Sequence, residues 1–208
     1  MKQALPIFPL GTTYLPGDVV QLHIFEDRYI QMCTDIESMN TGFVSVLIER
    51  GHEVGGSDIR CSYGVAVSIH DMFRADGRIL LTGQATHAVE ISHWLSDDPY
   101  PRAFCHSLDF QIPSDVSGED VVKTLKSLLS RVEFAEAIAV NDEISAINTR
   151  ESVPHDIVSD LFWAIARLIP SGPQDRYLLL QTQDLNERLS QLDEMITHFR
   201  EISQFQGG

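Results

Sequence analysis

Short apolar runs, separated by turn residues, fill the chain up to about residue 112. Each run is rich in β-branched or aromatic residues and ends near glycine, proline or aspartate, which is typical of the short strands of a small barrel or a curled sheet. The run at 43–48 gives the strongest prediction of a strand, and 75–78 has the composition of a hairpin turn. The predicted strands are 6–10, 19–24, 43–48, 63–69, 79–82, 85–94 and 103–108.

Two details refine this β-rich half. Pro6 and Pro9 lack the N–H that a strand needs for a second neighbour, so they predict that the first strand lies at an edge of the sheet. One helix is predicted at 26–38, where apolar residues recur at helical spacing, with Tyr29 and Met32 pointing inward. Arg28 is expected to pair with a carboxylate, and Gly17 to supply a positive φ in a turn.

After residue 113 the apolar period changes to that of a helix. Ser117 is a suitable N-cap for one helix, Pro154 for the first turn of another, and Asp184 for the cap of the last. Proline and glycine at 170–173 end the second of these helices. The pattern therefore predicts an α+β protein, with a β-rich subdomain at 1–112 and a helical bundle at 113–208.

Composition supports an ordinary globular protein. The 208 residues are 43% hydrophobic and 22% charged, close to the average for soluble domains. No uncharged apolar stretch approaches the length of a membrane span, and the first residues lack the apolar core of a signal peptide. We therefore expect a cytoplasmic protein without membrane partners.

The charge narrows the choice of partner. Lysine and arginine number 15 against 30 aspartates and glutamates, which gives a net charge of −15. Nucleic acids bind chiefly through clustered basic residues, and none are clustered here. We expect no nucleic-acid partner, because RNA binding could be argued here only from a barrel fold and the charge opposes it.

The search for reactive groups finds little. The sequence has no P-loop, no G-x-S-x-G, no H-E-x-x-H and no C-x-x-C motif. Cys33, Cys61 and Cys105 are read as reduced, mostly buried thiols, and the carboxylates Glu133 and Glu136 as a solvated helix face. We expect no catalytic residue, no cofactor and no resident metal.

Aromatic residues flank a turn-rich loop at 96–99. Trp94, Leu95 and Tyr100 could form a surface that contacts extended peptides, or they could fold back onto the barrel or the helices. We take these three residues as the candidate peptide-binding site and keep both arrangements open.

A family resemblance extends along nearly the whole chain. The opening 5–10 places prolines around Phe8, and a Pro-Gly turn at 16–17 and a Phe-Glu-x-Arg-Tyr segment at 25–29 follow. Further segments that match the same family pattern lie at 63–66, 76–78, 99–103 and 176–181, and at Arg188 and Leu189. Together these segments resemble the N-terminal domain of Lon proteases. One feature departs from the family pattern, because Gly83 is followed by Gln-Ala-Thr-His where the family usually has an arginine.

The resemblance implies a PUA-like pseudobarrel followed by helices, and a role in holding protein substrates. In Lon proteases an ATPase module and a Ser–Lys protease module follow this domain, and 208 residues have no room for either. We therefore expect a stand-alone, non-catalytic module that recognises unfolded or degron-bearing polypeptides or acts as an adaptor. The sequence specifies neither the partner nor the oligomeric state.

A different function is also considered. A small-ligand or metal-dependent enzyme could use a groove between barrel and helices, with His23, His70 or His87 beside a carboxylate. That alternative requires convergent polar groups in a deep pocket.

Overall fold

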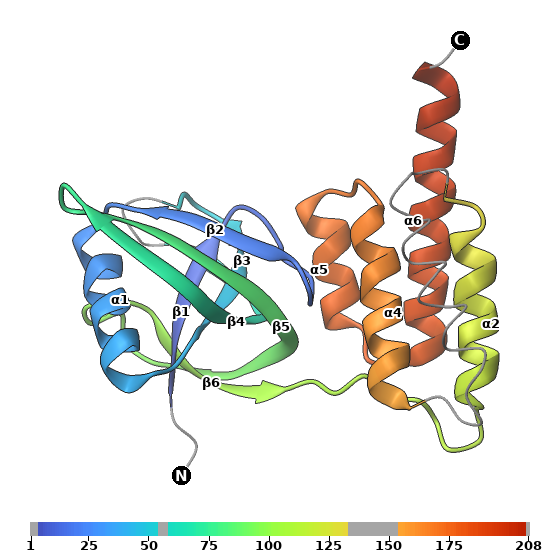
Figure 1. Ribbon diagram of the computed structural model, residues 1–208, viewed down its shortest axis with the longest axis horizontal. Coiled ribbons are helices and arrows are strands. Elements are labelled where there is room, and N and C mark those ends of the chain that lie inside the picture. The colour runs from blue at the N-terminus through green and yellow to red at the C-terminus, as the bar shows by residue number, and fades with distance from the viewer. Residues whose placement is uncertain (1–3, 54–57, 133–153, 207–208) are drawn as a thin grey trace. The chain divides into compact units, whose positions relative to one another are not determined.

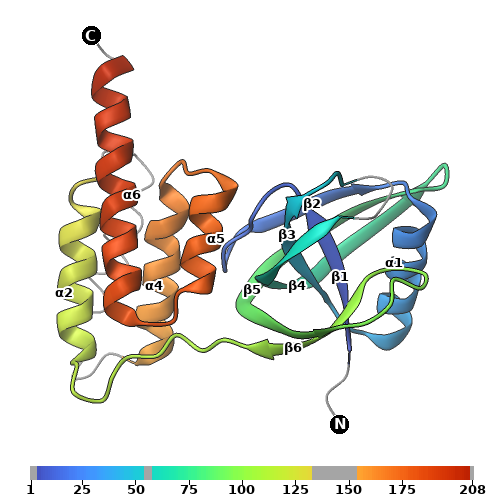
Figure 2. The ribbon, with the colours of Figure 1, turned by 180° about the vertical axis from the view of Figure 1, so that it is seen from behind.

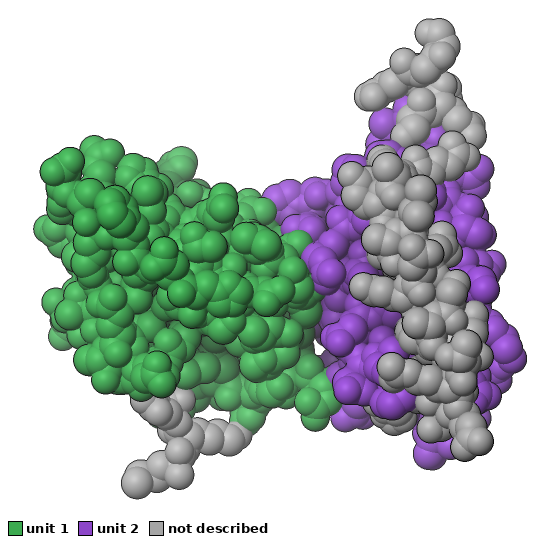
Figure 3. Space-filling model, viewed as in Figure 1, with its two compact units in different colours: residues 1–109 green, residues 110–208 purple. Residues whose placement is uncertain are grey.

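The computed structural model describes residues 4–53, 58–132 and 154–206. The chain divides into two compact units, residues 1–109 and residues 110–208 (Figure 3). The boundary predicted from the sequence pattern, between residues 112 and 113, lies close to this division.

The first unit is a strongly bent sheet of six strands with one helix (Figure 1). Its elements are β1 (Leu5–Leu10), β2 (Val19–Ile24), α1 (Asp27–Met39), β3 (Phe43–Arg50), β4 (Ile59–Ala75), β5 (Arg78–Trp94) and β6 (Arg102–Ser107). The sheet has the order β2-β5-β4-β3-β1-β6, and a further pairing of β5 with β6 closes five of the strands into a ring. β2 pairs with β5 outside that ring. The α+β prediction is confirmed.

The hairpin of β4 and β5 is longer than predicted. Each strand has 17 residues, and the two predicted strands at 79–82 and 85–94 are one continuous strand. Irregularities in the β4–β5 register at Ala66/Val67 and Ile69/Asp71 allow the strands to bend without ending. The hairpin can therefore pair with β2 near its turn and with β3 and β6 farther along.

The prediction that β1 is an edge strand is wrong. β1 pairs in parallel with β3 from Ile7 to Leu10, and antiparallel with β6 at Leu5 and Pro6. Ile7 donates to the carbonyl of Pro101 on the β6 side, at 2.8 Å. Successive N–H groups of a strand alternate in direction, so Pro9 would direct its N–H to the same side of β1 as Ile7 does. β6 pairs with β1 only at Leu5 and Pro6, so no acceptor of β6 is left unpaired by the missing N–H of Pro9. An interior strand can hold both prolines because its two partners overlap different parts of it.

Two glycines of the barrel are required by geometry. Gly17 has a φ of 90°, as expected from its place in a turn. Gly64 lies where β4 crosses β3, and a Cβ atom there would be 2.2 Å from the carbonyl oxygen of Ser45. Any side chain at position 64 would therefore force the two strands apart.

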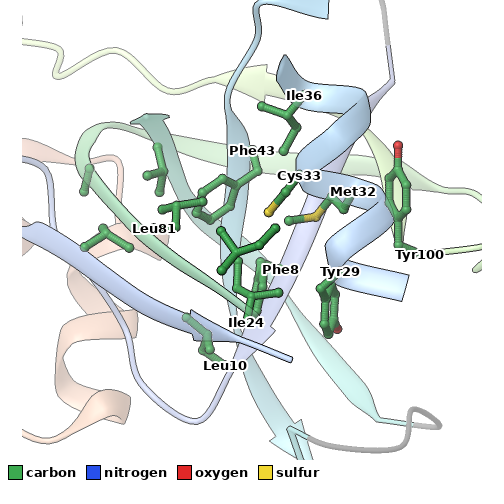
Figure 4. Packing of buried hydrophobic residues seen from close by; sticks show 14 of the residues in the cluster. Phe8, Leu10, Ile24, Tyr29, Met32, Cys33, Ile36, Phe43, Leu81 and Tyr100 are labelled. Carbon is green, nitrogen blue, oxygen red and sulfur yellow. The ribbon is translucent and has the colours of Figure 1, made fainter. Parts of the chain in front are cut away.

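The main core of this unit joins α1 to the sheet. Tyr29, Met32, Cys33 and Ile36 are the buried residues of α1. Figure 4 shows these side chains facing Phe8 and Phe43, and the ring of Phe8 stacks on Tyr29 with 4.2 Å between centroids. In both Figure 1 and Figure 2 the helix lies at one end of the barrel. The predicted inward direction of Tyr29 and Met32 is confirmed, as is the pairing of Arg28 with a carboxylate, which is Glu26 at 3.0 Å.

The second unit is helical. It contains α2 (Gly118–Leu129), α4 (His155–Leu168), α5 (Pro173–Gln181) and α6 (Leu185–Gln206). The predicted caps are confirmed, because Ser117 accepts from the N–H of Glu119 and Asp184 from the N–H of Glu187. Pro154 immediately precedes α4, where its missing donor costs no hydrogen bond. Glu133 and Glu136 lie outside the described residues.

An arginine is buried in this helical unit. Arg188 has 1% of its surface exposed, and its guanidinium lies over the rings of Phe110, at 4.9 Å, and Trp163, at 5.6 Å. Its Nε donates to the carbonyl of Thr182 at 2.5 Å. Burial lowers the pKa of this arginine to about 10. Two aromatic faces and one carbonyl therefore surround the charge, and the buried Nη2 has no hydrogen-bond partner among the described residues.

Alkaline pH is expected to destabilise the barrel. Burial raises the pKa of Tyr29 to about 12 and that of Cys33 to about 11, whereas the unperturbed values are 10.0 and 9.0. The unfolded chain therefore loses these protons first, and the stability held below pH about 9 declines as pH rises toward the folded-state values. Urea unfolding followed by circular dichroism at stepwise higher pH measures the effect. Cys33→Val is the control and should lose only part of the earlier decline, because burial also raises the pKa of Cys105 to about 11. A stability that is constant up to pH about 11 would contradict it.

Candidate functional site

An apolar row crosses the outer face of β2, β5 and β4. In the strand register His23 lies opposite Leu80, and Leu80 lies opposite Phe73. Directly opposed residues of antiparallel strands project from the same face of a sheet. Phe73 is 61% exposed and Leu80 is 54% exposed, so both turn away from the core.

Phe25 extends this row beyond the end of β2. It is 51% exposed, and its ring centroid lies 6.1 Å from that of His23. We call His23, Phe25, Phe73 and Leu80 the outer apolar row. A hollow of about 450 Å³ borders it, lined by His23, Phe73, Ala75, Asp76, Arg78 and Leu80.

The sequence analysis did not single out the outer apolar row. A signal for it was present, because 79–81 and 72–73 are consecutive apolar residues in strands that have one buried face. In such a run at least one side chain must point outward. Ile79 and Leu81 are buried, and Leu80 between them is not.

Of the three candidate peptide-binding residues, one is buried. Tyr100 is 3% exposed, and its hydroxyl donates to Oδ2 of Asp35 on α1 at 2.7 Å. Burial, followed by the contact with Asp35, raises its pKa to about 12. Trp94 and Leu95 are half-buried, and Trp94 packs against the smaller core cluster of the barrel. Tyr100 thus anchors the loop, while Trp94 and Leu95 keep part of their surface accessible.

Arg60 holds the same loop from the other side. Its guanidinium bonds Asp58 at 2.5 Å and Asp97 at 2.5 Å, and it lies 5.3 Å from the ring centre of Trp94. Burial would raise the pKa of Asp58, yet hydrogen bonding and the charge of Arg60 bring it below its usual value. Arg60 therefore links the start of β4 to the loop after β5 and covers one face of Trp94.

Replacing Arg60 by glutamine is expected to lower the free energy of unfolding by about 2 kcal/mol, because Asp58 would remain charged and nearly buried without its partner. Urea unfolding of the purified variant measures this change. Asp97→Asn is the matched control, and it should cost less than about 1 kcal/mol because Asp97 is largely solvated. Equal losses of stability for the two substitutions would contradict the claim that the buried Arg60–Asp58 pair contributes more than the exposed Arg60–Asp97 pair.

The helical unit carries a second hollow, which is mainly apolar. Its volume is about 360 Å³, and it lies between the end of α4, α5 and α6. Leu178 and Ile202 are its most exposed apolar side chains, and Asp175, Glu194 and His198 are at its border. The backbone groups within α5 and α6 are bonded inside their helices, and the segment 169–172 between α4 and α5 forms the rest of the rim.

The described residues do not bring reactive groups together. His23, His70 and His87 are all exposed and lie on β2, β4 and β5. Partial burial lowers the pKa of His87, although Asp109 opposes the shift. In the described ranges no three histidine, cysteine or acidic side chains are placed to hold a metal ion. Cys33, Cys61 and Cys105 are free thiols, and the first two are buried.

Comparisons with known proteins agree with this architecture. The family model of the ATP-dependent protease La (LON) substrate-binding domain matches residues 4–198. Lon protease of Syntrophus aciditrophicus (strain SB) is 23% identical over 97% of this chain and 26% of its own length. Lon protease of Roseiflexus castenholzii (strain DSM 13941 / HLO8) is 24% identical over 97% of this chain and 25% of its own length. The chain thus spans about a quarter of these curated relatives.

Two solved structures share the fold. A Lon N-terminal domain protein from Xanthomonas campestris superimposes with a TM-score of 0.59 at 22% identity, covering 91% of this chain and 96% of that one. The N-terminal domain of Mycobacterium avium complex Lon protease gives a TM-score of 0.56 at 18% identity, covering 94% and 98%.

A mixed β-barrel followed by helices is thus the class of protein that the fold defines. The chain belongs to the family of Lon substrate-binding domains, as the match over residues 4–198 shows. The resemblance noted in the sequence is confirmed. In the parts of the chain that the structure covers, no helix is both long enough and apolar enough to span a bilayer.

Proposed function

We propose that this chain is a non-catalytic module that binds unfolded or degron-bearing polypeptides of other proteins. The observation that carries the proposal is the outer apolar row, where Phe73 and Leu80 lie opposite each other near the turn of the β4–β5 hairpin and are both more than half exposed. Exposure of large apolar side chains to water is unfavourable, and their burial against a partner lowers the free energy of the system.

The family supports this choice. The matching model is described as a substrate-binding domain, and the curated relatives are named Lon proteases. A domain that receives protein substrates needs a surface that accepts many sequences. Apolar contact is non-directional and meets that need, because it requires area and not a particular hydrogen-bonding pattern.

The outer apolar row is a better receptor than the hollow in the helical unit. Its β2 end lies at an edge of the sheet, so backbone groups as well as side chains can contact an extended chain there. The charge of the protein adds a preference. With a net charge of −15, acidic segments are repelled and neutral or basic ones are favoured.

Trp94, Leu95 and Tyr100 retain a place in the proposal. The accessible parts of Trp94 and Leu95 would make a smaller second contact, and Tyr100 would hold their loop in position. We propose the cytoplasm as the location, since the three cysteines are free thiols. An adaptor role would use the same surfaces for a folded partner.

Isothermal titration with a permanently unfolded protein tests the function. Reduced lysozyme with its thiols blocked by iodoacetamide is a suitable probe, because it is basic and cannot refold. We expect saturable binding with a negative heat-capacity change, since that change accompanies the burial of apolar surface. Native lysozyme in the same buffer, at a salt concentration that screens charge, is the control. Absence of binding, or equal binding of native and unfolded lysozyme, would contradict the proposal.

A further inference from the structure

We propose that the free edge of β2 accepts an extended segment of the bound polypeptide as an added β-strand. This inference rests on the proposed function and specifies how the client is held. The segment would be neutral or basic, with apolar side chains at successive positions.

The first argument is that one side of β2 has no neighbouring strand in the described parts of the chain. β2 begins the strand order and pairs with β5 alone, from Val19 opposite Gln84 to Ile24 opposite Ile79. Among the described residues, none forms a backbone hydrogen bond with the other side of β2. The edge is therefore open for six residues, a length comparable to that of a typical strand.

The direction of the backbone groups follows from the neighbouring pair. The N–H of Ala85 donates to the carbonyl of Asp18 at 2.9 Å. Because bonded and non-bonded pairs alternate along antiparallel strands, Val20, Leu22 and Ile24 bond to β5. Val19, Gln21 and His23 consequently direct their N–H and carbonyl groups outward, where a new strand would find both donors and acceptors.

The second argument is that β2 itself carries none of the usual features that protect an edge strand. Proteins usually protect edge strands with lysine, proline, a bulge or an inward charge. β2 has the sequence VVQLHI, with no proline and no permanently charged residue, and its register with β5 has no irregularity. An unprotected β-branched edge is a template for strand pairing.

The third argument is a hollow beside the edge. It has a volume of about 150 Å³ and is lined by residues 21–26 together with Phe8, Leu10, Tyr29 and Glu53. Inward side chains of an added strand would lie over Phe8, Leu10 and Tyr29. Outward side chains would lie beside Val19 and Phe25, which are 63% and 51% exposed. Both faces of the added strand would thus meet apolar surface.

Two carboxylates set the charge preference. Glu26 and Glu53 both line the hollow, and the overall charge is −15. Glu26 is paired with Arg28, whereas an oxygen of Glu53 accepts from the N–H of Gly11 at 2.5 Å. A lysine or arginine flanking the bound segment would be attracted to this end of the hollow, and an acidic residue would be repelled.

A pair of substitutions at position 21 tests the added strand. Gln21→Pro removes an outward N–H without removing a bond to β5, and prolines are accepted at such positions of edge strands. Gln21→Ala removes the same side chain and keeps the N–H. Binding of unfolded lysozyme is expected to weaken about tenfold for Gln21→Pro, and by less than about threefold for Gln21→Ala.

Amide hydrogen exchange of the wild-type protein gives an independent readout. On binding unfolded lysozyme, the amides of Gln21 and His23 are expected to become protected. Binding without protection at these amides, or equal affinities of the two variants, would overturn strand addition and leave the proposed function standing. A wild-type protein that binds no unfolded probe would overturn both.

Discussion

Replacing Phe73 and Leu80 together by serine is expected to weaken the binding of unfolded lysozyme about 100-fold. Each side chain should contribute roughly 1.5 kcal/mol when it is buried against a client, which corresponds to about tenfold in affinity. The fold should persist because both residues are more than half exposed. The loss of their cross-strand contact costs no more than about 1 kcal/mol.

The matched control for this variant is Leu178→Ser in the helical unit. Leu178 is 42% exposed and borders the apolar hollow of the helical unit. Its replacement should leave the affinity within about twofold, since it does not belong to the outer apolar row. Isothermal titration measures both. A larger loss for Leu178→Ser than for the double variant would move the binding surface to the helices.

Replacing Phe43 by alanine is expected to lower the free energy of unfolding by about 3–5 kcal/mol. Phe43 is 1% exposed at the start of β3, and its ring centroid lies 6.0 Å from that of Phe8. Figure 4 shows it within the cluster that joins α1 to the sheet, so the neighbours cannot collapse into the space without moving the helix. Urea unfolding followed by circular dichroism measures the change.

Phe25→Ala is the control for that substitution. Phe25 is 51% exposed, and its loss should change the stability by less than about 1 kcal/mol. Similar losses for the two phenylalanines would mean that Phe43 does not lie in the core that joins α1 to the sheet.

Local structure was predictable because it depends on neighbouring residues. The bounds of β2 and the caps at Ser117 and Asp184 agree with the pattern of the sequence. Proline, glycine and helical spacing act over a few residues, so they can be read without knowing the rest of the fold.

Long-range pairing was not predictable in the same way. Pro6 and Pro9 suggested an edge, yet β1 lies inside the sheet because its two neighbours overlap different parts of it. The sequence pattern predicted two strands, at 79–82 and 85–94, whereas β5 continues through Gly83 without a break. Strand order and strand length depend on which segments pair, and the paired segments are distant from each other in the sequence.

The candidate site was the least predictable part. Trp94, Leu95 and Tyr100 drew attention because aromatic residues stood beside a turn, but Tyr100 is buried against Asp35. Phe73 and Leu80 are 7 positions apart and become neighbours only through the hairpin register. Which apolar residues face outward depends on the sheet that forms, whereas the likeness to the Lon family was visible in the sequence.

Site-specific photo-crosslinking tests the central claim most directly. A benzophenone amino acid replaces Phe73 in one variant and Leu178 in another, and each is irradiated with unfolded lysozyme and with native lysozyme. We expect unfolded lysozyme to crosslink at position 73, with little product at position 178 and little from native lysozyme. Crosslinking at position 178 without crosslinking at position 73 would contradict the claim that the outer face of β2, β5 and β4 holds the client.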